Sequence, residues 1–116
     1  MIILYYTTSK GKNPISDFLD SLTPQQQTKI LRVIFAIKEY GIEAAIPHVK
    51  KILNLPLWEI RILGKDNIRV FYVVPYKNTV LVLHGFIKKT QKTPNKEIKI
   101  ALSRYREWSQ RNPLDK

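Results

Sequence analysis

Apolar and polar residues alternate through the middle of the chain, between residues 57 and 92, with the two-residue period of β-strands. The stretches 64–67 and 75–78 interrupt this alternation with Gly, Pro, Asp and Asn, which are typical of tight turns. Short turns join antiparallel neighbours, so this region predicts a three-stranded antiparallel meander. The predicted strands are residues 57–62, 68–74 and 79–87.

Charged side chains break into these strands at positions that share one face. In the first strand Glu59 and Arg61 lie opposite the apolar side chains, and in the second strand Arg69 and Phe71 do the same. The third strand is apolar on both faces apart from His84. The sheet therefore carries two arginines at positions that a plain core fills with valine or leucine.

Two segments before the sheet show the periodicity and the end signals of helices. Asn13 and Pro14 predict the start of the first helix, and Thr23 with Gln26 forms a capping-box pair at the start of the second. The second helix extends to Gly41 and carries a broad apolar stripe. The stripe consists of Ile30, Leu31, Ile34, Phe35 and Ile37.

The remaining stretches complete an α+β fold. Residues 1–6 are rich in β-formers and predict a further strand of the sheet, whereas residues 42–56 predict an irregular connection. Thr93 is the predicted cap of a last helix, which ends at Asn112. We therefore expect a single domain over residues 1–116, with an antiparallel sheet, an N-terminal α-hairpin packed on one face and a C-terminal helix.

The chain is strongly basic. Its 116 residues include 20 Lys+Arg and 9 Asp+Glu, which gives a net charge of +11 and a pI near 10. Residues 1–58 hold 7 basic and 4 acidic side chains, a net of +3, and residues 59–116 hold 13 and 5, a net of +8. So basic a domain indicates a polyanionic partner or an acidic protein.

The composition argues against several classes of protein. There are no cysteines and the two histidines are far apart in sequence, so we expect neither disulfides nor a metal site, and no cofactor. No run approaches the roughly 20 apolar residues of a membrane span, and the N-terminus lacks a signal-peptide pattern. We expect a cytoplasmic protein without a membrane partner.

The cations of the sheet predict a site for phosphate groups. Arg61 and Arg69 lie on adjacent strands, and Lys88, Lys89 and Lys92 follow the end of the third strand. A guanidinium presents two parallel donors to phosphate oxygens and keeps its charge in any surroundings. For a single arginine, a solvated position on the sheet is the simpler interpretation, but two arginines beside a lysine run favour an anion site.

Other residues have two interpretations each. Glu59 is either a salt-bridge partner of Arg61 or a general base, and His84 is either a hydrogen-bonded core histidine or a proton-transfer group. Phe71 and Phe86 are core residues, unless one of them is exposed on the open sheet face and stacks on a base. The candidate RNA-binding residues are Lys65, Phe71, His84, Phe86 and Lys92.

Three motifs cover the predicted sheet and the segment after it: WEIR at 58–61, IRVFY at 68–72 and LHGFIKKTQKTP at 83–94. This pattern resembles the RelE/ParE toxin superfamily, and within it the HigB-like branch, which includes phage-derived host-inhibition proteins. The resemblance covers nearly the whole chain in order and length. Its most specific part is the third motif followed by a helix that contains Ala101 and Arg104.

The resemblance implies a RelE-like fold and a toxin of a type II toxin–antitoxin system that cuts messenger RNA on the ribosome without a metal. It also implies a small helix-turn-helix (HigA-like) antitoxin. The toxin would contact operator DNA only through this antitoxin. By position in the motifs, Arg69 matches the sheet arginine that contacts the scissile phosphate, and Arg61 matches a basic position on the preceding strand. Lys88 and Lys89 match a basic residue after the last long strand.

Two departures from the family pattern leave the proton acceptor open. Glu59 occupies a position that is basic in the best-known members, and no tyrosine follows soon after Thr93. The base is therefore Glu59 or a lysine whose pKa is lowered by neighbouring cations. A ParE-like toxin that poisons DNA gyrase is an alternative, against which the dense basic residues argue. A non-catalytic nucleic-acid-binding regulator is another, for which the net charge suffices.

The leading hypothesis is a nuclease with helices on one sheet face and an RNA site on the other, open face. The 2′-hydroxyl attacks the adjacent phosphate, Arg69 with Lys88 or Lys89 holds the non-bridging oxygens, and Arg61 positions the strand. Fixed cations stabilise the phosphorane preferentially because it carries more charge than the diester. The free protein should be a poor nuclease, because the ribosome orients the message.

Overall fold

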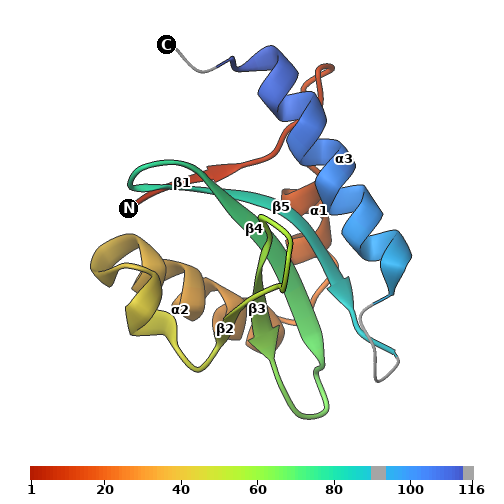
Figure 1. Ribbon diagram of the computed structural model, residues 1–116. Helices are drawn as coiled ribbons and strands as arrows, with labels where there is room; N and C mark the ends of the chain where they lie inside the picture. The colour runs from red at the N-terminus through yellow and green to blue at the C-terminus, as the bar shows by residue number, and fades with distance from the viewer. Residues whose placement is uncertain (90–93, 114–116) are drawn as a thin grey trace.

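The computed structural model describes residues 1–89 and 94–113, and its architecture is α+β, as the sequence predicts (Figure 1). One sheet lies between two layers of helices, with α1 and α2 on one face and α3 on the other. The elements are β1 (Ile2–Tyr5), α1 (Pro14–Asp20), α2 (Pro24–Tyr40), the 3-10 helix η1 (Ile42–Ala45), β2 (Val49–Lys51), β3 (Trp58–Ile62), β4 (Ile68–Tyr76), β5 (Thr79–Ile87) and α3 (Asn95–Arg111).

The five strands are arranged in the order β1-β5-β4-β3-β2. β3, β4 and β5 form the predicted antiparallel meander, and Asn67 and Asn78 in its turns have φ values of 51° and 64°, which asparagine tolerates better than most residues. β1, by contrast, pairs in parallel with β5, with Ile2 opposite Thr79. The prediction of a wholly antiparallel sheet is therefore wrong at this edge. The long connection from β1 to β5, which contains helices, permits parallel pairing.

The end signals of α1 and α2 are confirmed. The Asn13 side chain accepts a hydrogen bond from the Ser16 backbone N–H (3.0 Å). Thr23 and Gln26 form a reciprocal capping box, with hydrogen bonds of 3.0 and 3.2 Å. These side chains satisfy N–H groups that have no partner within the helix. α2 ends at Gly41, whose φ of 91° favours glycine.

α1 and α2 contribute to a core on the sheet face that carries the apolar positions of β3 and β4. Ile30, Ile34 and Ile37 of the predicted α2 stripe are buried, whereas Leu31 and Phe35 are 46% and 57% exposed. The buried stripe is thus narrower than predicted, and two of its large apolar side chains face away from the core.

α1 approaches the sheet closely at Gly85 of β5. A Cβ atom at this position would overlap the ring of Phe18, which packs against the same core. Glycine in the interior of a strand often marks such a close approach, and here it makes room for α1.

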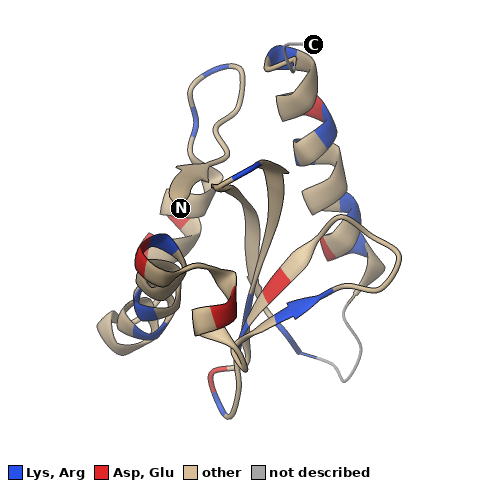
Figure 2. Cartoon of the chain, turned by 60° about the vertical axis from the view of Figure 1, so that its left-hand side comes forward, with Lys and Arg blue, Asp and Glu red and all other residues tan. Residues whose placement is uncertain are grey.

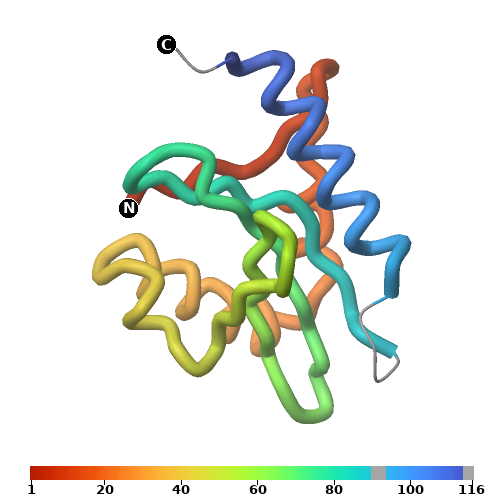
Figure 3. Tube along the Cα trace, viewed as in Figure 1, coloured from red at the N-terminus to blue at the C-terminus, as the bar shows by residue number. Residues whose placement is uncertain are grey.

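α3 packs on the opposite face of the sheet and forms a second core with it. Figure 3 shows the segment after β1 running beside α3, where the Tyr6 hydroxyl donates a hydrogen bond to Glu107 (2.7 Å). The second core buries part of the face that carries Arg69, so the expectation of an open face is wrong. The α3 side chains in this core are Ile98, Ala101, Leu102, Tyr105 and Trp108, as predicted.

Residues 42–56 are more regular than predicted, because they contain η1 and the edge strand β2. β2 pairs antiparallel with β3, which places Lys50 opposite Glu59 and Lys51 opposite Trp58. A strand of three residues that includes two lysines is too short to show the alternation that marks the longer strands.

α3 begins at Asn95, and Pro94 is in the N-cap position. The predicted cap, Thr93, lies outside the described residues. In the described part of the chain, no helix is both long enough and apolar enough to cross a membrane.

Candidate functional site

The two arginines of the sheet lie directly opposite each other. Arg61 on β3 is the Cα partner of Arg69 on β4, and Phe86 on β5 is the next partner in the same row. Like charges directly opposite one another destabilise a sheet. The pair therefore costs stability in the free protein unless a negatively charged group compensates it.

Arg69 is buried, with only 5% of its surface exposed, which corrects the expectation that it stands on an open face. One terminal nitrogen donates to the backbone carbonyls of Ile68 (3.1 Å) and Ile62 (3.5 Å). Burial lowers the pKa of Arg69, the Glu59 carboxylate raises it, and Arg61 lowers it. A guanidinium stays protonated through such changes, so the site contains a fixed positive charge.

Arg61 is half-buried. Its Nε atom and the Nε atom of Arg69 are both buried, and neither has a hydrogen-bond partner among the described residues. A buried donor without a partner costs roughly 1–3 kcal/mol. The unmet hydrogen bonds of both guanidinium groups therefore add to the cost of placing two like charges opposite each other.

Glu59 lies beside this arginine pair and is also buried, with 7% of its surface exposed. Its Oε1 atom is 4.0 Å from Nε of Arg69, an ion pair that the sequence did not predict. Lys50 on β2 is its cross-strand partner on the other side. The carboxylate thus lies between cationic residues of β2 and β4.

Lys88 is the lysine that the structure brings towards the arginines. Its N–H donates to the carbonyl of Asn67 (2.8 Å), and the Asn67 side-chain amide donates to the Lys88 carbonyl (2.6 Å). Lys88 follows the end of β5 directly and is two residues after Phe86, the cross-strand partner of Arg69. Lys89, the next residue, is exposed, and Lys92 lies outside the described residues.

His84 joins β5 to α3 instead of facing solvent. Its Nε2 atom lies 2.9 Å from Oε1 of Glu97, and its Nδ1 atom lies 3.2 Å from a terminal nitrogen of Arg104. Arg104 can only donate, so Nδ1 is the acceptor and Nε2 carries the proton of a neutral ring. Burial lowers the pKa of His84, the hydrogen bond that its ring donates to Glu97 raises it, and the charge of Arg104 lowers it. These contacts agree with the interpretation of His84 as a hydrogen-bonded core histidine.

The other predicted RNA contacts lie in different places. Phe71 is fully buried and Phe86 is 7% exposed; their rings pack together at 5.2 Å between centroids, so neither is exposed for stacking on a base. Lys65 is exposed in the turn between β3 and β4. Its neighbour Asp66 forms an ion pair with Lys29 of α2, which links this turn to the helical face.

A cleft of about 610 Å³ lies between α3 and the segment that follows β2. Glu59 and Lys50 line it, together with Asn54 and with Ile98 of α3. The sequence analysis did not predict this cleft. The Lys-Lys pair at 50–51, in the segment before the WEIR strand, was the available signal, but the pairing of Lys50 with Glu59 depends on the register of β2.

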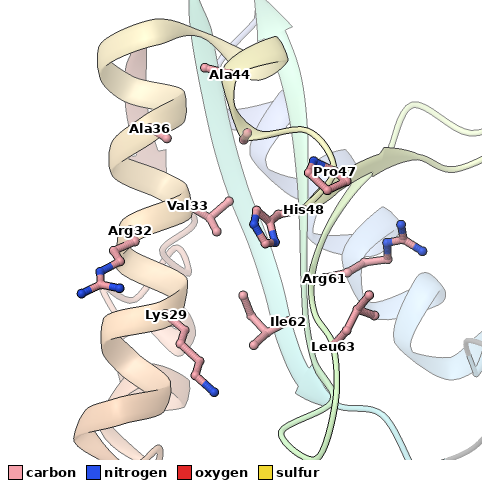
Figure 4. Close-up of a pocket in the computed structure, with 11 residues that line it drawn as sticks. Lys29, Arg32, Val33, Ala36, Ala44, Pro47, His48, Arg61, Ile62 and Leu63 are labelled. Atoms are coloured by element: carbon pink, nitrogen blue, oxygen red, sulfur yellow. The ribbon is translucent and has the colours of Figure 1, made fainter.

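A second cleft, of about 530 Å³, lies on the other side of β3. Figure 4 shows Val33 of α2, His48 and Ile62 pointing into this space, whereas the Arg61 side chain extends away from α2. Arg32 and Lys29 of α2 also line the second cleft. Arg61 lines this second cleft too, although strand alternation places Arg61 and Arg69 on the sheet face that α3 covers.

Basic residues are spread over several elements. Figure 2 shows Lys and Arg on the helices α2 and α3 and on strands of the sheet, including β2. Within residues 1–89 and 94–113, His, Cys, Asp and Glu form no group of three or more that would hold a metal ion. The described chemistry of the site is therefore that of fixed cations and one buried carboxylate.

The comparisons with known proteins point to a single family. Residues 17–106 match the family described as Phage derived protein Gp49-like (DUF891). The matched region contains all of β2, β3, β4 and β5, and with them the arginine pair. No curated protein matches the chain. Because the match spans well over half of its length, the chain belongs to the Gp49-like family of phage-derived proteins.

Proposed function

We propose that this protein is the toxin of a type II toxin–antitoxin system and cuts messenger RNA on the ribosome. Its family is toxin-like and related to RelE and HigB. The observation that carries the proposal is the pair Arg61 and Arg69, opposed across two strands, with neither Nε atom hydrogen-bonded within the described residues. An RNA phosphate would supply the missing acceptors.

The proposed reaction needs no metal. The 2′-oxygen attacks the adjacent phosphorus and loses its proton, the bond from phosphorus to the 5′-oxygen breaks, and the 5′-oxygen leaves with a proton. The products are a 2′,3′-cyclic phosphate and a 5′-hydroxyl. Arg69 and Lys88 stabilise the phosphorane, whose charge exceeds that of the diester. Each such contact contributes on the order of 10²–10³ in rate.

Glu59 is the positioning residue for Arg69 in this proposal. Its carboxylate lies 4.0 Å from Nε of Arg69. Its negative charge also compensates the positive charge of Arg61, which lies on β3 like Glu59. Arg61, which is half-buried, holds the RNA strand at the mouth of the site. Lys89 and Lys65 are exposed and contribute to the attraction of RNA, which weakens as salt rises.

The proposed partner is a small antitoxin of the helix-turn-helix class. Two features of the helical face favour binding there: Leu31 and Phe35 lie exposed one turn apart on α2, and the cleft of about 530 Å³ adjoins the same helix. An antitoxin bound at α2 would make the toxin too bulky for the ribosomal site without covering Arg69.

A purified translation reaction with primer extension on the message tests the proposed function. The wild-type protein should produce discrete cuts only when ribosomes are present. Arg69→Lys keeps the charge but loses the planar fork of donors, so its cutting rate should fall by about 10²-fold. Circular dichroism and thermal denaturation must show that this variant is folded, because Arg69 is buried.

Two results would contradict the proposal. Inhibition of DNA supercoiling by gyrase without any cut in the message would favour the ParE-like alternative. Binding of RNA without cutting, in the presence of ribosomes, would favour a non-catalytic regulator. A folded Arg69→Lys protein that cuts at the wild-type rate would remove Arg69 from the mechanism.

A further inference from the structure

The cleft between α3 and the segment after β2 combines a polar wall and an apolar wall. Lys50 and Glu59 line one part of it, and Leu53 and Ile98 line another. Leu53 is 85% exposed, which is unusual for a leucine beside a cavity. A volume of about 610 Å³ is within the range of pockets that bind small organic groups.

This cleft adjoins the arginine pair. Glu59 and Arg61 are two positions apart on β3, roughly 7 Å along the strand and on the same face. The Glu59 carboxylate also lies 4.0 Å from Nε of Arg69. A nucleotide whose phosphate lies at the two arginines would therefore have its base within reach of the cleft.

The polar wall presents an acceptor beside a donor. A glutamate carboxylate accepts hydrogen bonds at two oxygens, and a lysine ammonium only donates them. Glu59 and Lys50 are cross-strand partners, so the two groups lie next to each other. Guanine alone among the four RNA bases has two adjacent donors, N1–H and the 2-amino group, beside the O6 acceptor.

We propose that this cleft binds a guanine base of the RNA, with Glu59 accepting from N1–H and the 2-amino group and Lys50 donating to O6. Leu53 and Ile98 contact the faces of the base. The interpretation as an RNA site rests on the proposed nuclease function, but the binding of guanine is measurable without any cleavage.

Nucleoside monophosphates are the probes for this test. We expect guanosine 5′- or 3′-monophosphate to bind at least about ten-fold more tightly than the adenosine, cytidine and uridine compounds, as for a good bidentate contact. Inosine monophosphate lacks the 2-amino group and should bind several-fold more weakly than the guanosine compound. Calorimetric titration of the full chain measures each affinity.

Three variants assign the contacts. Lys50→Ala should weaken the binding of the guanosine and inosine compounds and leave the affinity for the cytidine compound unchanged, because cytosine has no O6. Leu53→Ala should weaken the binding of all the nucleoside monophosphates, and Leu53→Trp should strengthen it by adding a ring that stacks on the base. Leu31→Ala, an exposed leucine on α2, is the matched control and should change no affinity.

The proposal is overturned if the guanosine compounds bind no better than the adenosine ones, or fail to bind at millimolar concentration. It is also overturned if Lys50→Ala and Leu53→Ala both bind like the wild type. Translation reactions with messages that differ in one base at the cut separate the two proposals. Cuts at the same rate with and without guanine would support the nuclease function and contradict the guanine site. Selective binding of guanine without any cut would support the guanine site and contradict the nuclease function.

Discussion

Arg61 on β3 and Arg69 on β4 are Cα partners, and the Nε atoms of both are buried without a hydrogen-bond partner in the described chain. Opposed like charges on a sheet cost roughly 0.2–1 kcal/mol, and unpaired buried donors add to that cost. A site that sacrifices stability in this way is expected where function requires it. The free protein should therefore gain stability when Arg61 is neutralised, whereas neutralising Arg69 would break its ion pair with Glu59.

Arg61→Met tests this trade-off, because methionine keeps much of the stem and removes the charge. We expect the free energy of unfolding to rise by about 0.5–1 kcal/mol, which raises Tm by a few degrees in a domain of this size. The rate of message cleavage should fall by about 10²-fold. Thermal denaturation and primer extension measure the two effects on the same preparation.

Arg106→Met is the control for that experiment, since Arg106 is exposed on α3 and should affect neither quantity. A fall in Tm for Arg61→Met would show that Arg61 makes a net favourable interaction in the free protein. In that case the arginine pair would no longer be a sign of an anion site.

Glu59→Gln separates a positioning role from a catalytic one. If Glu59 holds Arg69, replacing its carboxylate by the neutral amide of glutamine should lower the free energy of unfolding by about 3 kcal/mol, because the buried guanidinium of Arg69 loses its ionic partner. On a message without guanine at the cut, cleavage should then fall by less than about ten-fold, far below the loss of a transition-state contact. The pH dependence of the rate should keep its shape, because the titrating group is elsewhere.

The opposite result identifies Glu59 as the general base. The rate would then fall by about 10²–10⁴-fold. Ribosome binding, measured by co-sedimentation, should be unchanged in either case and shows that the variant is folded under the assay conditions.

His84 should make the stability of the protein depend on pH. Burial lowers its pKa from the ordinary value of 6.5, with Arg104 lowering it further and the Glu97 hydrogen bond opposing. Below about pH 6.5 the unfolded chain binds a proton that the folded protein does not. The contribution of neutral His84 is therefore complete above that pH and is lost as the pH falls through the folded pKa.

Thermal denaturation between about pH 5 and 8 measures this dependence. His84→Gln keeps a donor for Glu97 and an acceptor for Arg104, and it should flatten the fall in Tm towards acid pH. His48→Gln alters an exposed histidine outside this cluster and should leave the wild-type slope. If both variants have that slope, His84 does not cause the acid sensitivity.

Alternation along the chain was sufficient to predict β3, β4 and β5 and to place Glu59, Arg61 and Arg69 on one face, because a strand has a strict two-residue period. It did not predict that this face is half covered, because α3 reaches the sheet through packing of residues distant in sequence. Cap residues predicted the starts of α1 and α2 for a similar local reason.

Contacts between distant residues account for the rest of what sequence reasoning missed. β2 has three residues, and its register with β3, which pairs Lys50 with Glu59, has no signal within its own segment. Gly85 was visible as a motif residue, but its reason lies in the approach of Phe18 from α1. The hydrogen bonds of His84 with Glu97 and Arg104 likewise depend on the position of α3.

The antitoxin should bind the helical face without covering Arg69. Amide hydrogen exchange of the toxin, with and without the partner from its operon, should show protection within residues 14–41. Leu31→Ala combined with Phe35→Ala should weaken the complex by about ten-fold or more, since both side chains are exposed in the free protein and apolar anchors dominate such interfaces. The thermal stability of the double variant should match that of the wild type.

Salt dependence and a matched surface variant complete this test. Association should slow as salt rises, because a domain of net charge +11 attracts an acidic partner over a distance. Leu53→Ala removes an exposed leucine on the opposite side of the sheet, and it should leave the affinity for the antitoxin unchanged. Protection of residues 58–71 and 86–89, with α1 and α2 unaffected, would mean that the antitoxin instead covers the arginine pair and blocks the RNA directly.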